Sequence, residues 1–149
     1  MQVAIDSSVL VGLINPRDLW REEALTLREA LLNSGAELLY FDCVVTESVS
    51  AAARRLHEKG RLTEIEALLD RLDAQVPNET ITWILPDVPD LYPEVIDLIR
   101  SSAGALNFND ALIALACRDR GIPAIASFDT DFDQVTWLRR LAQPEDAAT

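Results

Sequence analysis

The sequence predicts an α/β fold, a three-layer α/β/α sandwich around a mostly parallel sheet. Short apolar runs alternate with longer segments in which apolar residues recur at helical spacing. Apolar runs without polar alternation are typical of strands that are buried on both faces. No internal repeat or linker interrupts the pattern. Strands that alternate with helices in this way predict helices on both faces of one sheet.

The length and composition fit one globular domain. The chain has 149 residues, and 49% of them are hydrophobic. We assign residues 1–142 to this domain and expect 143–149 to be a disordered tail. No apolar run approaches the roughly 18 residues of a membrane helix, and no signal peptide is visible. Cys43 and Cys117 match no metal spacing and are expected to be buried, reduced thiols, so the prediction is a cytoplasmic protein without a membrane partner.

The first strand covers Val3–Ile5 and ends at Asp6. The helix after it, over residues 7–14, is predicted to be capped by Ser7 or Ser8. A break over residues 15–18 follows. An apolar stripe then predicts a helix over residues 20–32, which an Asn-Ser-Gly sequence ends.

The middle of the chain begins with a second apolar strand over residues 38–41. Asp42 is predicted to cap a helix that runs to about residue 59, where a glycine follows. Residues 62–72 have an apolar side and predict a further amphipathic helix. Residues 80–85 are β-rich and predict a third strand.

The last third begins with a helix over residues 91–101, with its start near Pro93. A helix over residues 110–120 is predicted to be capped by an asparagine at 107 or 109 and closed by a glycine. The apolar run 123–127 is a buried strand, residues 129–133 are a loop, and residues 135–141 form the last strand.

Acidic residues lie next to the predicted ends of these elements. Asp6 ends the first strand, and Asp129 lies two residues past the strand over 123–127. Glu47 lies one to two turns inside a helix, and Asp110 opens another. The carboxyl edge of an open α/β sheet is where ligands bind. We therefore expect these four side chains to converge there.

A cluster of four carboxylates stores electrostatic repulsion. Two like charges about 4 Å apart repel by roughly 1 kcal/mol in water and by more near a protein surface. A divalent cation relieves this repulsion, and ligands that are all oxygen suit Mg²⁺ or Mn²⁺ rather than zinc. The only histidine, His57, belongs to no zinc motif. Simpler interpretations stay open for Asp110, as a helix-dipole partner, and for Asp129, as part of a solvated turn.

Two other chemistries are less consistent with the sequence. The acids at residues 129–133 are spaced like the start of a calcium loop, but Gln134 replaces the required glycine and Arg140 the closing glutamate. An aspartyl-phosphate hydrolase needs a second acid where Ser8 stands, and a late lysine. The only lysine is Lys59, in a predicted helix end. No nucleotide-binding glycine loop occurs.

The net charge of −12 repels nucleic acid at long range. A phosphodiester substrate is compatible with this negative charge if metal cations offset the acids locally, or if arginines gather on one rim of the site. Candidates for such arginines are Arg17, Arg54 and Arg55. The alternative, that the acidic surface only keeps the protein soluble, stays open.

Four stretches in order resemble the PIN-domain ribonucleases, of the kind found as toxins of VapBC-type toxin–antitoxin pairs. They are Ala4–Leu10, Thr46-Glu47, Asn109–Ala114 and Ile125–Phe132. The resemblance implies cleavage of single-stranded RNA or RNA loops with Mg²⁺ or Mn²⁺, and an antitoxin and a second copy of the chain (a homodimer) as partners. The alternative is a PIN-fold interaction module without catalysis, which would bind a protein through the amphipathic helices between residues 20 and 72.

The resemblance also assigns residues. The catalytic and metal-binding acids it implies are Asp6, Glu47, Asp110 and Asp129, with Asp131 as a further metal ligand and Ser7 and Ser127 as supporting hydroxyl groups. Ser8 stands where the family frequently has asparagine.

Overall fold

The computed structural model describes residues 1–148 and has five strands in one sheet, in the order β3-β2-β1-β4-β5. All four strand pairings are parallel. The strands are β1 (Gln2–Ile5), β2 (Glu37–Phe41), β3 (Ile81–Thr82), β4 (Ala124–Ala126) and β5 (Arg139–Leu141). The central position of β1 agrees with its uninterrupted apolar run.

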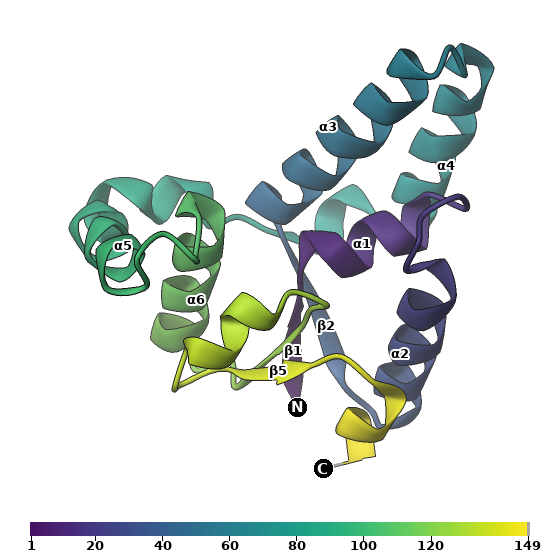
Figure 1. Ribbon diagram of the computed structural model, residues 1–149. Helices are drawn as coiled ribbons and strands as arrows, with labels where there is room; N and C mark the ends of the chain where they lie inside the picture. Colours follow the sequence, from purple (N-terminus) through teal and green to yellow (C-terminus); the bar gives the residue numbers. More distant parts are fainter. Residues whose placement is uncertain (149) are drawn as a thin grey trace.

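Six α-helices connect the strands. They are α1 (Ser7–Ile14), α2 (Arg21–Asn33), α3 (Asp42–Glu58), α4 (Ile65–Gln75), α5 (Val88–Ser101) and α6 (Phe108–Arg120). In Figure 1, α5 and α6 lie on one side of the strands, and α1 and α2 lie on the other. The strand order reverses direction at β1, since β4 lies on the opposite side of β1 from β2. The predicted α/β sandwich is confirmed.

Two arginines hold the C-terminal end of α1 in place. The guanidinium of Arg21 donates hydrogen bonds to the carbonyl groups of Gly12 and Leu13. Arg71 Nε donates to the carbonyl of Ile14 at 2.7 Å. These carbonyls have no partner inside the helix, and positive charge is favourable at this end of a helix. The helix that begins at the sheet edge is therefore held at its far end by α2 and α4.

The strand predicted over residues 80–85 is much shorter than expected. Only Ile81–Thr82 pairs with β2. The backbone N–H groups of Ile84 and Leu85 donate instead to the carboxylate of Asp42, each at 3.0 Å. The prediction that Asp42 caps α3 is wrong, because Phe41 is the N-cap and Asp42 is the first residue of the helix. The buried carboxylate of Asp42 instead joins the start of α3 to the segment after β3. Because these two N–H groups bond to the carboxylate of Asp42, they do not pair with β2, and the strand ends at Thr82.

The predicted last strand is also shorter, because residues 135–138 form turns. The N–H of Val135 bonds to the carbonyl of Phe132, and that of Leu138 to the carbonyl of Val135. Only Arg139–Leu141 pairs with β4. The helix α5 begins at Val88, earlier than predicted.

The expected disordered tail differs from the structure. Pro144–Ala148 forms a 3₁₀ helix, and this segment packs against α2. Asp146 Oδ2 accepts hydrogen bonds from the N–H groups of Ala142 and Gln143, at 2.8 and 2.9 Å. Its carbonyl accepts from Arg139 at 2.7 Å. Thr149, the end of the expected tail, lies outside the described residues.

The cysteine prediction agrees with the structure. Cys43 and Cys117 are free and buried, and burial raises the pKa of both thiols to about 12. Among residues 1–148, no helix is long and apolar enough to cross a membrane.

Candidate active site

The four predicted acids line one pocket at the carboxyl edge of the sheet. The cavity has a volume of about 330 Å³, and its lining includes Asp6, Glu47, Asp110 and Asp129. These side chains come from the end of β1, from α3, from α6 and from the segment after β4. We call this cavity the carboxylate pocket. The convergence expected from the sequence is therefore found, although the residues lie far apart along the chain.

Asp6 is held by two hydroxyl groups, one from the first turn of α1 and one from the residue after β4. Its Oδ2 accepts hydrogen bonds from Ser8 Oγ and Ser127 Oγ, both at 2.7 Å. Asp6, rather than the predicted Ser7 or Ser8, is the N-cap of α1, since its side chain accepts from the N–H of Ser8. The β1–β4 register places Ile5 opposite Ala126, so the next residues, Asp6 and Ser127, meet at the sheet edge.

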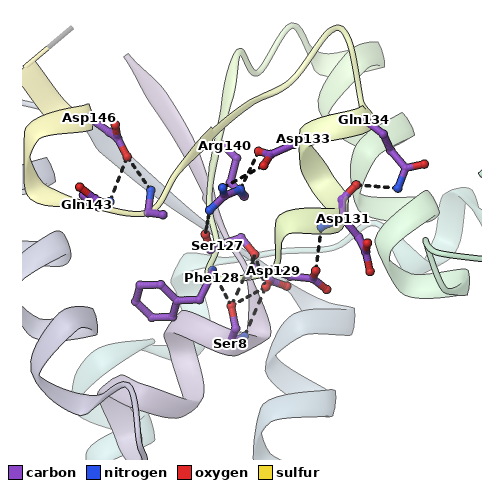
Figure 2. A network of polar contacts seen from close by, with 12 residues as sticks. Ser8, Ser127, Phe128, Asp129, Asp131, Asp133, Gln134, Arg140, Gln143 and Asp146 are labelled. Atoms are coloured by element: carbon purple, nitrogen blue, oxygen red, sulfur yellow. Dashed lines mark hydrogen bonds and ion pairs between the residues drawn. The ribbon is translucent and has the colours of Figure 1, made fainter.

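The two hydroxyl groups also order the segment that follows β4. The N–H of Phe128 donates to Ser8 Oγ at 3.1 Å, and that of Asp129 donates to Ser127 Oγ at 3.0 Å. Figure 2 shows Ser8 and Ser127 next to each other beside Asp129. The same pair of serines thus positions the first and the last acid of the pocket.

Ser8, not Ser7, is the main hydroxyl partner of Asp6 from α1. Ser7 Oγ is 3.5 Å from Asp6 Oδ1, a much weaker contact than that of Ser8. Ser127 contacts Asp6, as its proposed supporting role requires. From the sequence, Ser8 is a candidate helix cap and a departure from the family pattern, but it is not predicted as a supporting residue. The asparagine that the family frequently has at this position is also polar, and this could have indicated that Ser8 supports the site.

Asp110 lies in the first turn of α6 and forms a capping box with Asn107. Asn107 Oδ1 accepts from the N–H of Asp110 at 3.0 Å, and Asp110 Oδ2 accepts from the N–H of Asn107 at 2.9 Å. Burial is the main cause that raises the pKa of Asp110 to about 6, against the opposing effect of the hydrogen bond from the N–H of Asn107. The negative charges of Asp6, Asp129 and Glu47 make smaller contributions in the same direction as burial.

Each of the other two acids is held by one neighbour. Asn109 Nδ2 donates to Glu47 Oε2 at 3.2 Å. The N–H of Asp131 donates to Asp129 Oδ1 at 2.8 Å, at the start of the 3₁₀ helix Thr130–Gln134. The loop predicted here is thus a capped helical turn. The Asp131 side chain does not line the carboxylate pocket, and its backbone is what holds Asp129.

The four carboxylates share one pattern, with one oxygen anchored and the other less engaged. Among residues 1–148, no hydrogen bond reaches the second oxygen of Glu47, Asp110 or Asp129, and that of Asp6 has only the 3.5 Å contact. Anchored carboxylates with open oxygens fit a hard divalent cation such as Mg²⁺ or Mn²⁺. As the side chains stand, no group of three or more His, Cys, Asp or Glu in the described chain is close enough together to hold a metal ion.

Three further residues in the lining of the carboxylate pocket are Ser48, Asp18 and Arg55. The sequence predicts no role for the first two and leaves Arg55 as one of several candidate arginines. Ser48 is fully buried, and its hydroxyl has no partner. A water molecule in the pocket would satisfy it. Asp18 is a fifth acid in the lining, and its Oδ2 pairs with Arg55 at 3.3 Å. Of the arginines considered from the sequence, Arg55 lines this pocket and Arg54 does not.

Arg140 and Asp133 form a structural ion pair beside the site. Arg140 Nε and Nη2 contact the two carboxylate oxygens of Asp133 at 2.7 and 3.0 Å, as Figure 2 shows. Arg140 also donates to the carbonyl of Ser127 at 3.3 Å. This pair fixes the segment after β4 to β5, and it gives the acid at 133 a role outside the pocket.

The fold and site define an α/β domain with an acidic pocket at the point where its parallel strand order reverses. The PIN domain model matches residues 3–138, so the chain belongs to the PIN-domain family. Among solved structures, the chain is similar to the toxin VapC20 of Mycobacterium tuberculosis, described as cleaving the sarcin-ricin loop. The TM-score is 0.68 at 18% identity, over 91% of this chain and 95% of that one. A comparison with curated proteins gives no match.

Proposed function

We propose that this chain is a Mg²⁺- or Mn²⁺-dependent endoribonuclease and the toxin of a toxin–antitoxin pair. The observation that carries the proposal is the convergence of Asp6, Glu47, Asp110 and Asp129 in one pocket, where the last three each have an oxygen that accepts no hydrogen bond within the described chain. Membership of the PIN-domain family and the likeness to a VapC toxin support it. The proposed setting is the cytoplasm, with an antitoxin protein and a second copy of the chain as partners.

The proposed roles follow from the position of each side chain. Asp6 and Asp110 are the buried acids and would hold the cation directly, while the half-buried Glu47 and Asp129 complete its surroundings or accept hydrogen bonds from water. A bound divalent cation supplies charge neutralisation at the phosphate and lowers the pKa of a bound water molecule.

The chain's own contribution is to orient the carboxylates. Ser8 and Ser127 fix Asp6 in one orientation, as outer-shell partners of ligands do in metal sites. The capping box holds Asp110 at the start of α6. These contacts fix the two buried acids of the pocket, and binding of a cation would require the carboxylates to move closer together than they stand.

Cleavage of RNA tests the proposal. The purified chain is incubated with a fluorescent single-stranded RNA, with Mg²⁺, with Mn²⁺, and with chelator. We expect cleavage only with the metals, and a loss of at least about 100-fold in Asp6→Asn, since outer-shell changes alone cost about 10- to 100-fold in metal sites. Asp90→Asn is the matched control, because Asp90 is an exposed acid in the first turn of α5.

Two results contradict the proposal. Equal cleavage by Asp6→Asn and wild type assigns the activity to a contaminant or to another site. A folded wild-type chain that cleaves no RNA under any metal condition favours the interaction module without catalysis. Melting curves of both variants establish that they are folded before the rates are compared.

A further inference from the structure

A basic pocket adjoins the carboxylate pocket. It has a volume of about 260 Å³, and its lining includes Arg17, Arg55, Lys59 and Arg61. These are four of only 13 basic residues in a chain of net charge −12, so positive charge is concentrated here against the overall trend. The two pockets share Asp18, Trp20 and Arg55 in their linings, so they are neighbouring parts of one surface.

A single row of side chains along α3 links the two pockets. Glu47, Ala51 and Arg55 line the carboxylate pocket, and Arg55 and Lys59 line the basic pocket. Glu47, Ala51 and Arg55 are spaced by four along α3, and Lys59, the C-cap of the helix, follows at the same spacing. They form one ridge with about 6 Å of rise between neighbours. The row changes from an acid to two cations over about 18 Å. Arg54, next to this row, lines neither pocket.

Two of the cations are held only by weak surface pairs, since Glu64 contacts Arg17 at 3.2 Å and Arg61 at 3.8 Å. Exposed pairs of this kind contribute little to stability. Arg55 pairs with Asp18 at 3.3 Å, and its own side chain is 57% exposed whereas that of Asp18 is 9% exposed. Within the described chain, Lys59 has no ion pair. A phosphate group can therefore replace Glu64 at Arg17 and Arg61 and bind Lys59 at little cost, and it can contact the exposed guanidinium of Arg55 while Asp18 stays paired.

Trp20 stands at the junction of the two pockets. Its ring stacks on Phe128, with the centroids 5.0 Å apart and an interplanar angle of 19°, and Trp20 is 43% exposed. Asp18 orients this junction, since its Oδ1 accepts from the N–H of Trp20 at 2.9 Å and its Oδ2 pairs with Arg55. An aromatic ring beside a positive groove is the usual platform for single-stranded nucleic acid.

We infer that an RNA strand runs from the carboxylate pocket over Trp20, which stacks one base, into the basic pocket, which holds the neighbouring backbone phosphates. This inference rests on the proposed ribonuclease function and assigns the binding of the strand outside the cleavage point. Arg17, Arg55, Lys59 and Arg61 bind phosphate oxygens, and Asp18 positions Trp20 and Arg55. An acidic protein segment is the competing occupant, and the measurements below separate the two.

Binding is measured by fluorescence anisotropy of a labelled single-stranded RNA in chelator, so that no cleavage occurs. Four phosphate contacts predict a slope of log affinity against log salt near −2.8, at about 0.7 per contact on a single strand. In Lys59→Gln/Arg61→Gln the slope should shrink by about 1.4 and the affinity should fall by about tenfold. The matched control is Arg54→Gln/Arg100→Gln, which removes the same charge outside both pockets and should bind as wild type does.

The stacking role is tested with two substitutions of Trp20. Trp20→Ala should weaken RNA binding by about tenfold, whereas Trp20→Phe should retain most of the affinity, because any aromatic ring offers a face to a base. Equal affinity of Trp20→Ala and wild type overturns the stacking contact. Melting curves verify that both variants keep the fold.

The outcomes distinguish this inference from the proposed function. If RNA cleavage depends on Asp6 but the two double variants bind RNA with equal affinity and slope, the basic pocket does not hold the strand, while the ribonuclease proposal stands. If polyglutamate binds wild type, and the Lys59→Gln/Arg61→Gln change abolishes this but leaves RNA binding intact, the occupant is an acidic protein segment. If wild type neither binds nor cleaves RNA, both proposals fail.

Discussion

Asp110→Asn is expected to stabilise the metal-free protein at pH 8. The substitution removes one of four interacting charges at almost constant shape. Asparagine keeps an oxygen that can accept the hydrogen bond from the N–H of Asn107, which Asp110 Oδ2 accepts at 2.9 Å, so the capping box can persist. The variant therefore mimics the protonated form of Asp110.

The size of the effect follows from the raised pKa. The pKa of Asp110 rises from 3.8 to about 6, mainly through burial. Each pKa unit corresponds to a free-energy difference of about 1.36 kcal/mol between the two protonation states. The upper limit on the stabilisation by Asp110→Asn is therefore about 3 kcal/mol. The pocket is open to solvent, which screens the charges, and we expect about 1–2 kcal/mol. This corresponds to roughly 4 °C in melting temperature for a domain of this size.

The pH dependence has a definite sign. The folded protein binds the Asp110 proton more tightly than the unfolded chain does, because its folded pKa is the higher one. The stability that this proton contributes is present below about pH 4 and is lost as the pH rises through about 6. Wild type and variant should therefore differ little near pH 4.5 and diverge toward pH 8.

The assay is a set of melts in chelator at pH 4.5 and pH 8, followed by melts with Mg²⁺ at fixed ionic strength. At ten times the dissociation constant, a cation bound at one site stabilises the folded state by about 1.4 kcal/mol. Wild type should gain this stability, and Asp110→Asn should gain much less. Asp90→Asn is the control for an exposed helix-start aspartate outside the carboxylate pocket.

An opposite sign would refute the reasoning. If Asp110 only interacted favourably with the dipole of α6, its replacement would destabilise the protein by about 0.3–1 kcal/mol, as expected for Asp90→Asn. A destabilised Asp110→Asn that responds to Mg²⁺ as wild type does would show that Asp110 belongs to no cation site.

Two substitutions elsewhere test the packing of the fold by chemical denaturation. Asp42→Ala removes the acceptor of the buried N–H of Ile84 and of the half-buried N–H of Leu85, and should lower the free energy of unfolding by about 3 kcal/mol, with partial recovery in Asp42→Asn; an effect below 1 kcal/mol would mean that other groups satisfy these donors. Gly12→Ala places a Cβ 2.7 Å from Ala24 Cβ, so the loss of about 1–3 kcal/mol from overpacking should outweigh the gain in helix propensity. A stabilised Gly12→Ala would show that α1 and α2 separate easily.

The sequence predicted the main features of the site because few arrangements were possible. An apolar strand that ends in Asp6, and another that ends two residues before Asp129, must bring these acids to one edge if the strands are parallel. Asp110 could be placed because helix starts have recognisable caps, and Asn107, one of the two predicted candidates, is the observed cap.

The remaining features depended on side-chain choices that spacing does not reveal. Ser7 and Ser8 are equally polar, and only the turn after Asp6 determines that Ser8 faces Ser127. Asp42 follows β2 as Asp6 follows β1, yet its carboxylate accepts hydrogen bonds from backbone N–H groups of a segment 42 residues away. The length of a strand cannot be predicted when a side chain competes for its donors.

The serine bridge at Asp6 also has a consequence for biosynthesis. Ser127 lies 121 residues after Asp6, and β2, the other neighbour of β1 in the sheet, is synthesised long before β4. A nascent chain therefore carries Asp6 and Ser8 through most of its synthesis without Ser127, the second hydroxyl group that orients Asp6, and without Asp129. The local β1–β2 pairing can form early, while closure of the long loop to β4 comes last. The carboxylate pocket is completed only when the final third of the chain has left the ribosome, so a truncated product cannot carry an assembled site.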